Sequence, residues 1–250
     1  MATASRPSLP NVTLVAVTSV ALQATIDALH ASMEQVDFGQ VLLLSDRPAG
    51  DADRRIAWRQ IERLGSSADY SRFMLRELAD HVSTDHALCV QWDGFVLDGG
   101  AWDPAFLDYD YIGAVWPHFD DDHDVGNGGF SLRSRRLLEA SRHLAWNGRE
   151  AEDVVISRIA RPDLEKNGIR FAPSAVARRF AYERTRPTGH EFGFHGAFNL
   201  VRYLPARRAA ELFATLEPEL LARSERVELL GWALARGRFK LAKNMLTRLL

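Results

Sequence analysis

The N-terminal part of the chain alternates between continuous apolar runs and a segment with helical spacing. Residues 11–17 (NVTLVAV) are rich in β-branched side chains, residues 19–36 carry apolar side chains at helical spacing, and residues 38–46 (FGQVLLLSD) form a second apolar run. Such runs are typical of buried strands. Two strands joined by a helix pair in parallel, because the crossover returns the chain to the same end of the sheet. The pattern predicts an α/β fold with a mixed, mostly parallel sheet flanked by helices.

The next segments extend this pattern. Residues 54–61 suggest a short third strand and residues 84–97 a further apolar strand. Residues 68–82 have the spacing of an amphipathic helix, with Asp69 or Ser71 near its start.

Beyond residue 97 the alternation breaks. We expect helices over residues 130–146 and 150–168, the second stopped by Gly168, and then a short strand with an extended segment over residues 169–183. These elements would complete one large domain.

Length and pattern predict three parts. A chain of 250 residues with 46% hydrophobic residues can bury one large core. We expect a flexible tail over residues 1–10, the main domain over residues 11–204, and a small helical appendage over residues 205–250. The appendage would be a helical cap or a scaffold for a protein partner.

Composition excludes several classes of partner. Thirty-one basic and 33 acidic residues give a formal charge of −2, so no global field favours nucleic acid or an anionic membrane. No stretch has the roughly 18 to 20 apolar residues of a membrane span, and the N-terminus lacks the apolar core of a signal peptide. The single cysteine, Cys89, lies in an apolar run and is expected in the core. We expect a cytoplasmic protein.

Two apolar runs end in aspartate, at Asp46 and at Asp93. Ligands of α/β sheets lie beyond the carboxyl ends of strands, so both are candidates for donor or cofactor binding. Gln91 lies two residues before Asp93 and on the same side, where the pair could present oxygens to a divalent cation on a phosphate. The alternative is an aspartate that only begins the turn at Gly94.

Three further clusters contain residues that could carry chemistry. Glu152 and Asp153 are a candidate general base, or simply acids favoured at a helix start. His195, in the glycine and aromatic cluster GFHGAFN, is a candidate metal ligand, or a core histidine in a tight turn. The acidic run over residues 120–124 is expected to be a solvated loop. The sequence has no GxSxG nucleophile elbow, no P-loop and no cysteine pairing for zinc.

Six separated motifs carry a resemblance to a known family. They occur in the order YSRFMLRELADHVSTDHALCVQWDGFVL, WDPAFLDYDYIGAVW, VGNGGFSLRSRRLLEA, EDVVISR, GIRFAPSAVARRFAYE and FGFHGAFN. Together they resemble a bacterial family, catalogued as a domain of unknown function, that looks like a GT-A glycosyltransferase with a Rossmann-like sheet. The GNGGFSLRS and EDV segments are remotely similar to the pattern of galactosyltransferases.

The resemblance implies a set of roles. Asp93 would hold the place of the last aspartate of the DxD motif, which binds Mn²⁺ or Mg²⁺ on the donor diphosphate, with Gln91 in place of its first acid. His195 resembles the C-terminal histidine ligand of such enzymes. Asp153, or Glu152 beside it, matches the base that activates the acceptor hydroxyl in inverting enzymes.

The glycine loop over residues 126–129 has two interpretations. Alone it resembles a phosphate cradle, with the arginines at 133, 135 and 136 nearby. With the six motifs, Gly128 and Gly129 are expected to let donor sugar approach the backbone, and Arg133 to lie on a mostly solvated helix face. The remaining side chains expected to contact sugar are Trp116, Asn127 and Phe130.

The function that follows is glycosyl transfer. A nucleotide-diphosphate sugar would be the donor and a glycan or glycolipid hydroxyl the acceptor, in bacterial surface polysaccharide or glycoconjugate synthesis, by an inverting, metal-assisted reaction. A retaining reaction stays open. The alternatives are a non-catalytic module that binds sugar nucleotide or glycan, since Gln91 replaces an acid, and a helical interaction scaffold.

Overall fold

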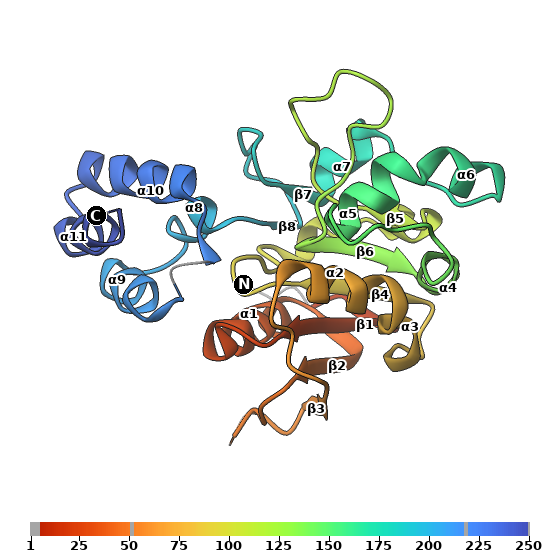
Figure 1. The fold of residues 1–250 in the computed structure, drawn as a ribbon, viewed down its shortest axis with the longest axis horizontal. Coiled ribbons are helices and arrows are strands. Elements are labelled where there is room, and N and C mark those ends of the chain that lie inside the picture. Colours follow the sequence, from red (N-terminus) through yellow and green to blue (C-terminus); the bar gives the residue numbers. More distant parts are fainter. Residues whose placement is uncertain (1–5, 51–52, 218–219, 250) are drawn as a thin grey trace. The chain divides into compact units, whose positions relative to one another are not determined.

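The computed structural model describes residues 6–50, 53–217 and 220–249 (Figure 1). The chain divides into two compact units, Met1–His195 and Gly196–Leu250. The first unit contains the strands, and the second is helical. The boundary between the units follows residue 195, whereas the sequence predicts a boundary after residue 204.

The first unit is built on a six-stranded sheet with the order β3-β2-β1-β4-β6-β5. Its strands are β1 (Ser8–Thr18), β2 (Asp37–Ser45), β3 (Ile56–Gln60), β4 (His86–Val90), β5 (Tyr111–Ile112) and β6 (Phe130–Ser134). β1 to β4 pair in parallel, and β6 is antiparallel to both of its neighbours. The prediction of an α/β fold with a mixed, mostly parallel sheet flanked by helices is confirmed.

Helices cover both faces of this sheet (Figure 1). Along β1, Leu14 and Ala16 join one core cluster with α1 (Leu22–Gln35) and α7 (Ser174–Phe180), and the alternate residues join a second cluster. The helices on the second face are α2 (Ser67–Arg76), α3 (Leu78–His81) and α4 (Arg135–Ser141). Strands buried on both faces are continuously apolar, which accounts for the runs in the sequence.

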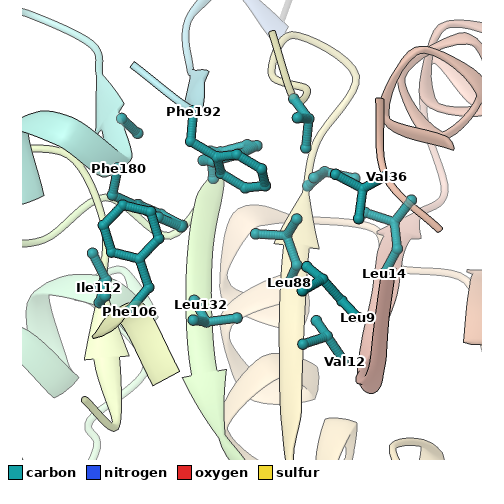
Figure 2. Packing of buried hydrophobic residues seen from close by; sticks show 14 of the residues in the cluster. Leu9, Val12, Leu14, Val36, Leu88, Phe106, Ile112, Leu132, Phe180 and Phe192 are labelled. Carbon is teal, nitrogen blue, oxygen red and sulfur yellow. The ribbon is translucent and has the colours of Figure 1, made fainter. Parts of the chain in front are cut away.

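Aromatic side chains close the first face above β4 and β6. Phe106, Phe180 and Phe192 pack edge to face or tilted against one another, next to Leu88 and Leu132 (Figure 2). Aromatic pairs of this geometry add to the free energy gained from apolar burial. This cluster anchors the C-terminal third of the unit to the sheet.

A second, two-stranded sheet lies in the same unit. It consists of β7 (Ala181–Tyr182) and β8 (Gly193–Phe194), which pair in parallel. Between β6 and β7 the chain forms α4, then α5 (Glu152–Val154), a π-helical turn (Val155–Ile159) and α6 (Arg161–Lys166).

Several sequence predictions are confirmed. The helix and strand expected over residues 19–46 are α1 and β2, and the short strand over residues 54–61 is β3. Gly168 follows α6 with a φ of 82°, as a left-handed helix stop requires. Cys89 is buried in the core.

The prediction that Asp69 lies near the start of the second helix is confirmed. It is in the first turn of α2, and its amide donates a hydrogen bond to the hydroxyl of the capping residue Ser66 at 3.1 Å.

Other predictions are wrong. β1 begins at Ser8, so the expected tail includes three residues of a strand, with Leu9 buried; residues 1–5 lie outside the described residues.

Two errors concern the type of element. Residues 130–134 of the helix expected over 130–146 form β6; the segment FSLRS alternates apolar and polar residues as a strand does, but it runs without a break into the helical spacing of α4, which favours a single helix over both. Residues 174–180, expected to be extended, form α7. Pro173 precedes this helix, and its alanines and arginines are good helix formers.

The second unit consists of four helices in its described residues. They are α8 (Ala197–Leu200), α9 (Ala206–Thr215), α10 (Arg223–Ala235) and α11 (Phe239–Thr247). Side chains of α11 bond to the backbone of α9, where Asn244 Nδ2 donates to the Ala210 carbonyl at 2.8 Å. The buried residues Leu229 of α10 and Met245 of α11 contribute to its interior.

Candidate active site

The candidate site forms where β4 ends and β6 begins. Val90 pairs with Phe130 across these antiparallel strands. The segment after β4, which contains Gln91 and Asp93, therefore meets the glycine loop that precedes β6. This is the carboxyl edge of the parallel strands, where α/β sheets bind ligands.

The small parallel sheet adds two more side chains. Tyr182 pairs with Phe194, and Glu183 and His195 are the residues that directly follow the two strands. The His195 amide donates to the Tyr182 carbonyl at 3.0 Å. Parallel register thus brings Glu183 and His195 together, although the sequence indicated only His195.

The imidazole of His195 lies at the centre of the site. Its Nε2 is 3.2 Å from Asp93 Oδ1 and 3.3 Å from Gln91 Oε1, and its Nδ1 is 3.1 Å from Glu183 Oε1. Burial opposes protonation of His195, but the two neighbouring carboxylates outweigh it and raise the pKa of the imidazole well above its usual value. Burial likewise opposes ionisation of Glu183, yet the contact with His195 leaves the pKa of that carboxyl lowered.

Asn127 links the glycine loop to this imidazole. It adopts a φ of 71°, in the left-handed region that asparagine tolerates better than most residues. Its Oδ1 accepts a hydrogen bond from the Phe130 amide at 3.2 Å, and its Nδ2 lies 3.1 Å from His195 Nδ1. The Asn127 side chain is buried and engaged within the protein.

The glycines of the loop allow close packing against side chains. A Cβ on Gly129 would lie 2.0 Å from His195 Nε2, and one on Gly128 would lie 2.2 Å from Glu152 Oε1. A Cβ on Gly126 would lie 2.2 Å from the Trp116 ring. No side chain fits at these distances, so the loop needs glycine to approach the histidine and the acid pair together.

The two acids of the EDV segment have different environments. Glu152 is buried, and its Oε1 lies 2.9 Å from Arg133 Nη2 in a buried ion pair. Asp153 is half-buried, and its Oδ2 accepts a hydrogen bond from the Gly128 amide at 2.8 Å. Burial and the charge of Glu152 raise the pKa of Asp153 to about 6. Of the two, Asp153 has the environment of a general base near neutral pH.

Arg133 corrects an expectation from the sequence. It was expected on a mostly solvated helix face, but it lies in β6 and its side chain is fully buried. Its Nε donates to Ser131 Oγ at 3.0 Å, and its Nη2 contacts Glu152. A buried arginine on a strand has no signal in local sequence patterns, because its partner is 19 residues away.

The remaining predicted residues lie in different surroundings. Phe130 is fully buried in the aromatic cluster, with its ring against Gly193, so its side chain belongs to the core and not to a sugar subsite. Trp116 is mostly buried and covers Gly126. Asp46, at the end of β2, lines an open hollow of about 650 Å³ with residues 60–63 and is separated from β4 by β1.

The acidic run over residues 120–124 forms a loop, as expected. Asp121 pairs with Arg158 at 2.6 Å, and both side chains are partly exposed. Within the described residues, no three or more His, Cys, Asp and Glu side chains are grouped to hold a metal ion.

A divalent cation has a smaller donor set available beside His195. Asp93 Oδ1 belongs to a buried side chain and lies 3.2 Å from His195 Nε2, which also lies 3.3 Å from Gln91 Oε1. A carboxylate oxygen, an amide oxygen and an imidazole nitrogen are donors that Mn²⁺ accepts, and phosphate oxygens and water commonly complete such sites. These residues therefore fit a cation held jointly with a ligand.

The described part of the chain contains no helix with the length and apolar character needed to cross a membrane.

Fold and site together define an α/β protein with a histidine-centred, acidic site at the carboxyl edge of its sheet. A family model described as a protein of unknown function, DUF5672, matches residues 55–195, which is more than half of the chain. The chain belongs to this family. No curated protein matches the chain.

Two solved structures are similar in fold. The mannosyltransferase PcManGT from Pyrobaculum calidifontis, in complex with GDP-Man and Mn²⁺, is 12% identical with a TM-score of 0.42, over 98% of this chain and 74% of that one. A glycosyltransferase involved in the glycosylation of the major capsid of PBCV-1 is 11% identical with a TM-score of 0.48, over 80% of this chain and 98% of that one. At this level of similarity, neither assigns an activity to the chain.

Proposed function

We propose that the protein is an inverting glycosyltransferase that moves a sugar from a nucleotide-diphosphate donor to a hydroxyl of a glycan or glycolipid. One observation carries the proposal: the glycine loop contacts both Asp153 and His195. Gly128 donates to the Asp153 carboxylate, and Gly129 packs against the His195 ring beside Asp93. A base and a phosphate-binding group are the two needs of this reaction.

Asp153 is the proposed base. Its carboxylate accepts the proton of the acceptor hydroxyl while the hydroxyl oxygen attacks C1 of the donor sugar. The bond between C1 and the diphosphate oxygen breaks, and the electron pair leaves with the nucleoside diphosphate. A pKa of about 6 leaves Asp153 ionised at neutral pH and able to accept this proton.

Asp93, His195 and Gln91 are the proposed holders of a Mn²⁺ or Mg²⁺ ion. When bound, the cation would neutralise charge on the departing diphosphate. The proposal is supported by the closeness of the three donor atoms: Asp93 Oδ1 and Gln91 Oε1 lie 3.2 and 3.3 Å from His195 Nε2.

The donor is proposed to lie along the carboxyl edge of the sheet. Asp46 and the hollow beside it would contact the nucleoside, and the backbone of Gly128 and Gly129 would border the sugar. Trp116 and Asn127 are the proposed neighbours of the transferred sugar, because Trp116 covers the glycine loop and Asn127 is part of it.

A cytoplasmic location and a protein partner for the second unit are also proposed.

A screen of nucleotide sugars by thermal shift, with and without Mn²⁺, tests the function. A donor that binds the native state must raise the midpoint of unfolding, and a true donor should release nucleoside diphosphate when an acceptor is added. Binding without release would favour a non-catalytic module. No shift with any nucleotide sugar would contradict the proposal, and an inverted anomer in the product would confirm the inverting reaction.

A further inference from the structure

Glu183 contacts the side of the His195 ring that faces away from the proposed cation site. Its Oε1 lies 3.1 Å from Nδ1, while Nε2 on the opposite side of the ring faces Asp93 and Gln91. Parallel pairing of β7 and β8 places Glu183 and His195 at equivalent ends of adjacent strands. The contact is thus built into the backbone register and not into a surface loop.

The chemistry of the Glu183 carboxylate affects which ring nitrogen carries hydrogen. An ionised carboxylate only accepts hydrogen bonds, so Glu183 favours hydrogen on Nδ1, while Asp93 and Gln91 present acceptor oxygens to Nε2. A cation bound to Asp93 and Gln91 would take the place of the hydrogen on Nε2, and Glu183 would then hold the remaining ring hydrogen on Nδ1. A neutral His195 with hydrogen on Nδ1 has its lone pair on Nε2. That lone pair points to the side of the ring where Asp93 Oδ1 lies.

A similar contact orients Gln91. Its Nε2 donates to the Tyr70 hydroxyl at 3.0 Å, which leaves Oε1 directed toward His195. The phenolic oxygen of Tyr70 can accept this bond. Two of the three donor atoms are therefore fixed by residues behind them.

We propose that Glu183 is a positioning residue, which holds His195 in the orientation and tautomer that present Nε2 to a divalent cation shared with Asp93 and Gln91. This inference rests on the cation of the proposed function. Carboxylates that accept the second ring hydrogen of a metal-binding histidine commonly raise metal affinity, and their loss weakens it by about 10- to 100-fold.

Direct binding of Mn²⁺, measured by the electron paramagnetic resonance signal of the free ion, tests the proposal without an activity assay. Glu183→Ala should weaken Mn²⁺ binding by about 10- to 100-fold. Glu183→Gln should have a smaller effect, because an amide oxygen still accepts the Nδ1 hydrogen. The matched control is Glu191→Gln, which removes the charge of a buried glutamate that accepts bonds from Thr188 and Gly189; its Mn²⁺ affinity should equal that of the wild type.

A second measurement separates positioning from a general loss of structure. Nitrogen NMR of His195 in metal-free protein, at a pH where the ring is neutral, should show a larger share of the tautomer with hydrogen on Nδ1 in the wild type than in Glu183→Ala. Unchanged Mn²⁺ affinity in both Glu183 variants would overturn the role of Glu183 while leaving the cation site intact. Failure of the wild type to bind Mn²⁺, with or without nucleoside diphosphate, would also overturn the role of Glu183. The proposed glycosyl transfer with Asp153 as base would then still be testable by an assay without metal.

Discussion

Arg133 Nη2 lies 2.9 Å from Glu152 Oε1, and both side chains are buried beneath the glycine loop. The pair joins β6, the strand next to the sheet edge, to α5, the short helix that contains Asp153. Arg133 Nη2 also lies 3.4 Å from the Gly128 carbonyl, so the same guanidinium supports the loop. The ion pair thus connects the sheet both to the glycine loop and to the helix that contains Asp153.

Breaking this pair should destabilise the protein strongly. Glu152→Gln or Arg133→Met leaves one buried charge without its partner, so we expect the free energy of unfolding to fall by about 3 kcal/mol in each variant. Urea denaturation measures the loss. The double variant Arg133→Met/Glu152→Met should lose clearly less than the sum of the two, because neither charge remains buried.

The exposed pair Lys166–Asp163 provides the control for this experiment. Asp163→Asn should change the free energy of unfolding by no more than about 0.5 kcal/mol. Single variants of Arg133 and Glu152 that are as stable as the Asp163 variant would show that the buried pair contributes nothing.

Asp153 should make stability depend on pH. Its folded pKa of about 6 is higher than the roughly 3.9 of an unfolded aspartate. Between these values the folded state holds a proton that the unfolded state has lost, so the wild type loses stability as pH rises from about 4 to about 7. Asp153→Asn removes this dependence and should therefore gain stability relative to the wild type over the same interval.

Urea denaturation of the wild type and of Asp153→Asn at pH 4.5 and pH 7.5 measures the free energy of unfolding of each protein. The contributions of the other titratable groups cancel in the difference between the two proteins. A stability difference that stays constant between the two pH values would contradict a raised pKa for Asp153.

Gly129→Ala should displace His195. The new methyl group would lie 2.0 Å from Nε2, so the imidazole must move away from Asp93. We expect a loss of stability of about 1 to 3 kcal/mol from overpacking, together with loss of Mn²⁺ binding. Isothermal titration and urea denaturation measure the two effects.

Gly231 of α10 is the matched control, because a Cβ there meets no atom within 4 Å. Gly231→Ala should raise stability by up to about 1 kcal/mol, as alanine is the better helix former. If Gly129→Ala binds Mn²⁺ as tightly as Gly231→Ala, the close contact with His195 has no role in the site.

The sequence predicts the frame of the fold because its first half follows simple periodicities. The apolar runs that become β1, β2 and β4 are continuous, and α1 shows clear helical spacing. The strand β6 was missed, because its five residues alternate only briefly and continue directly into α4, so the pattern favours one helix.

The candidate site was predictable to the extent that each residue follows a strand or begins a helix. Asp93 was identified because it follows an apolar run, and His195 because of its glycine and aromatic neighbours and the family resemblance; the structure brings them to 3.2 Å. Glu183 and Tyr70 were not identified, because their importance depends on partners 12 and 21 residues away. Contacts of this kind arise from strand register and packing, which local patterns do not encode.

The choice between Glu152 and Asp153 also required the structure. Adjacent helix residues point in different directions, and here Glu152 turns to Arg133 while Asp153 lies under the Gly128 amide. The proposed base, Asp153, therefore differs from Glu152 in its surroundings, although both are carboxylic acids.

The central claim is tested most directly by the rate of sugar transfer in Asp153→Asn, measured with the donor found by thermal shift. The variant should bind the donor with unchanged affinity and transfer sugar about 10² to 10⁴ times more slowly than the wild type, the usual loss for a general base. Transfer at the wild-type rate in a correctly folded Asp153→Asn protein would contradict the account.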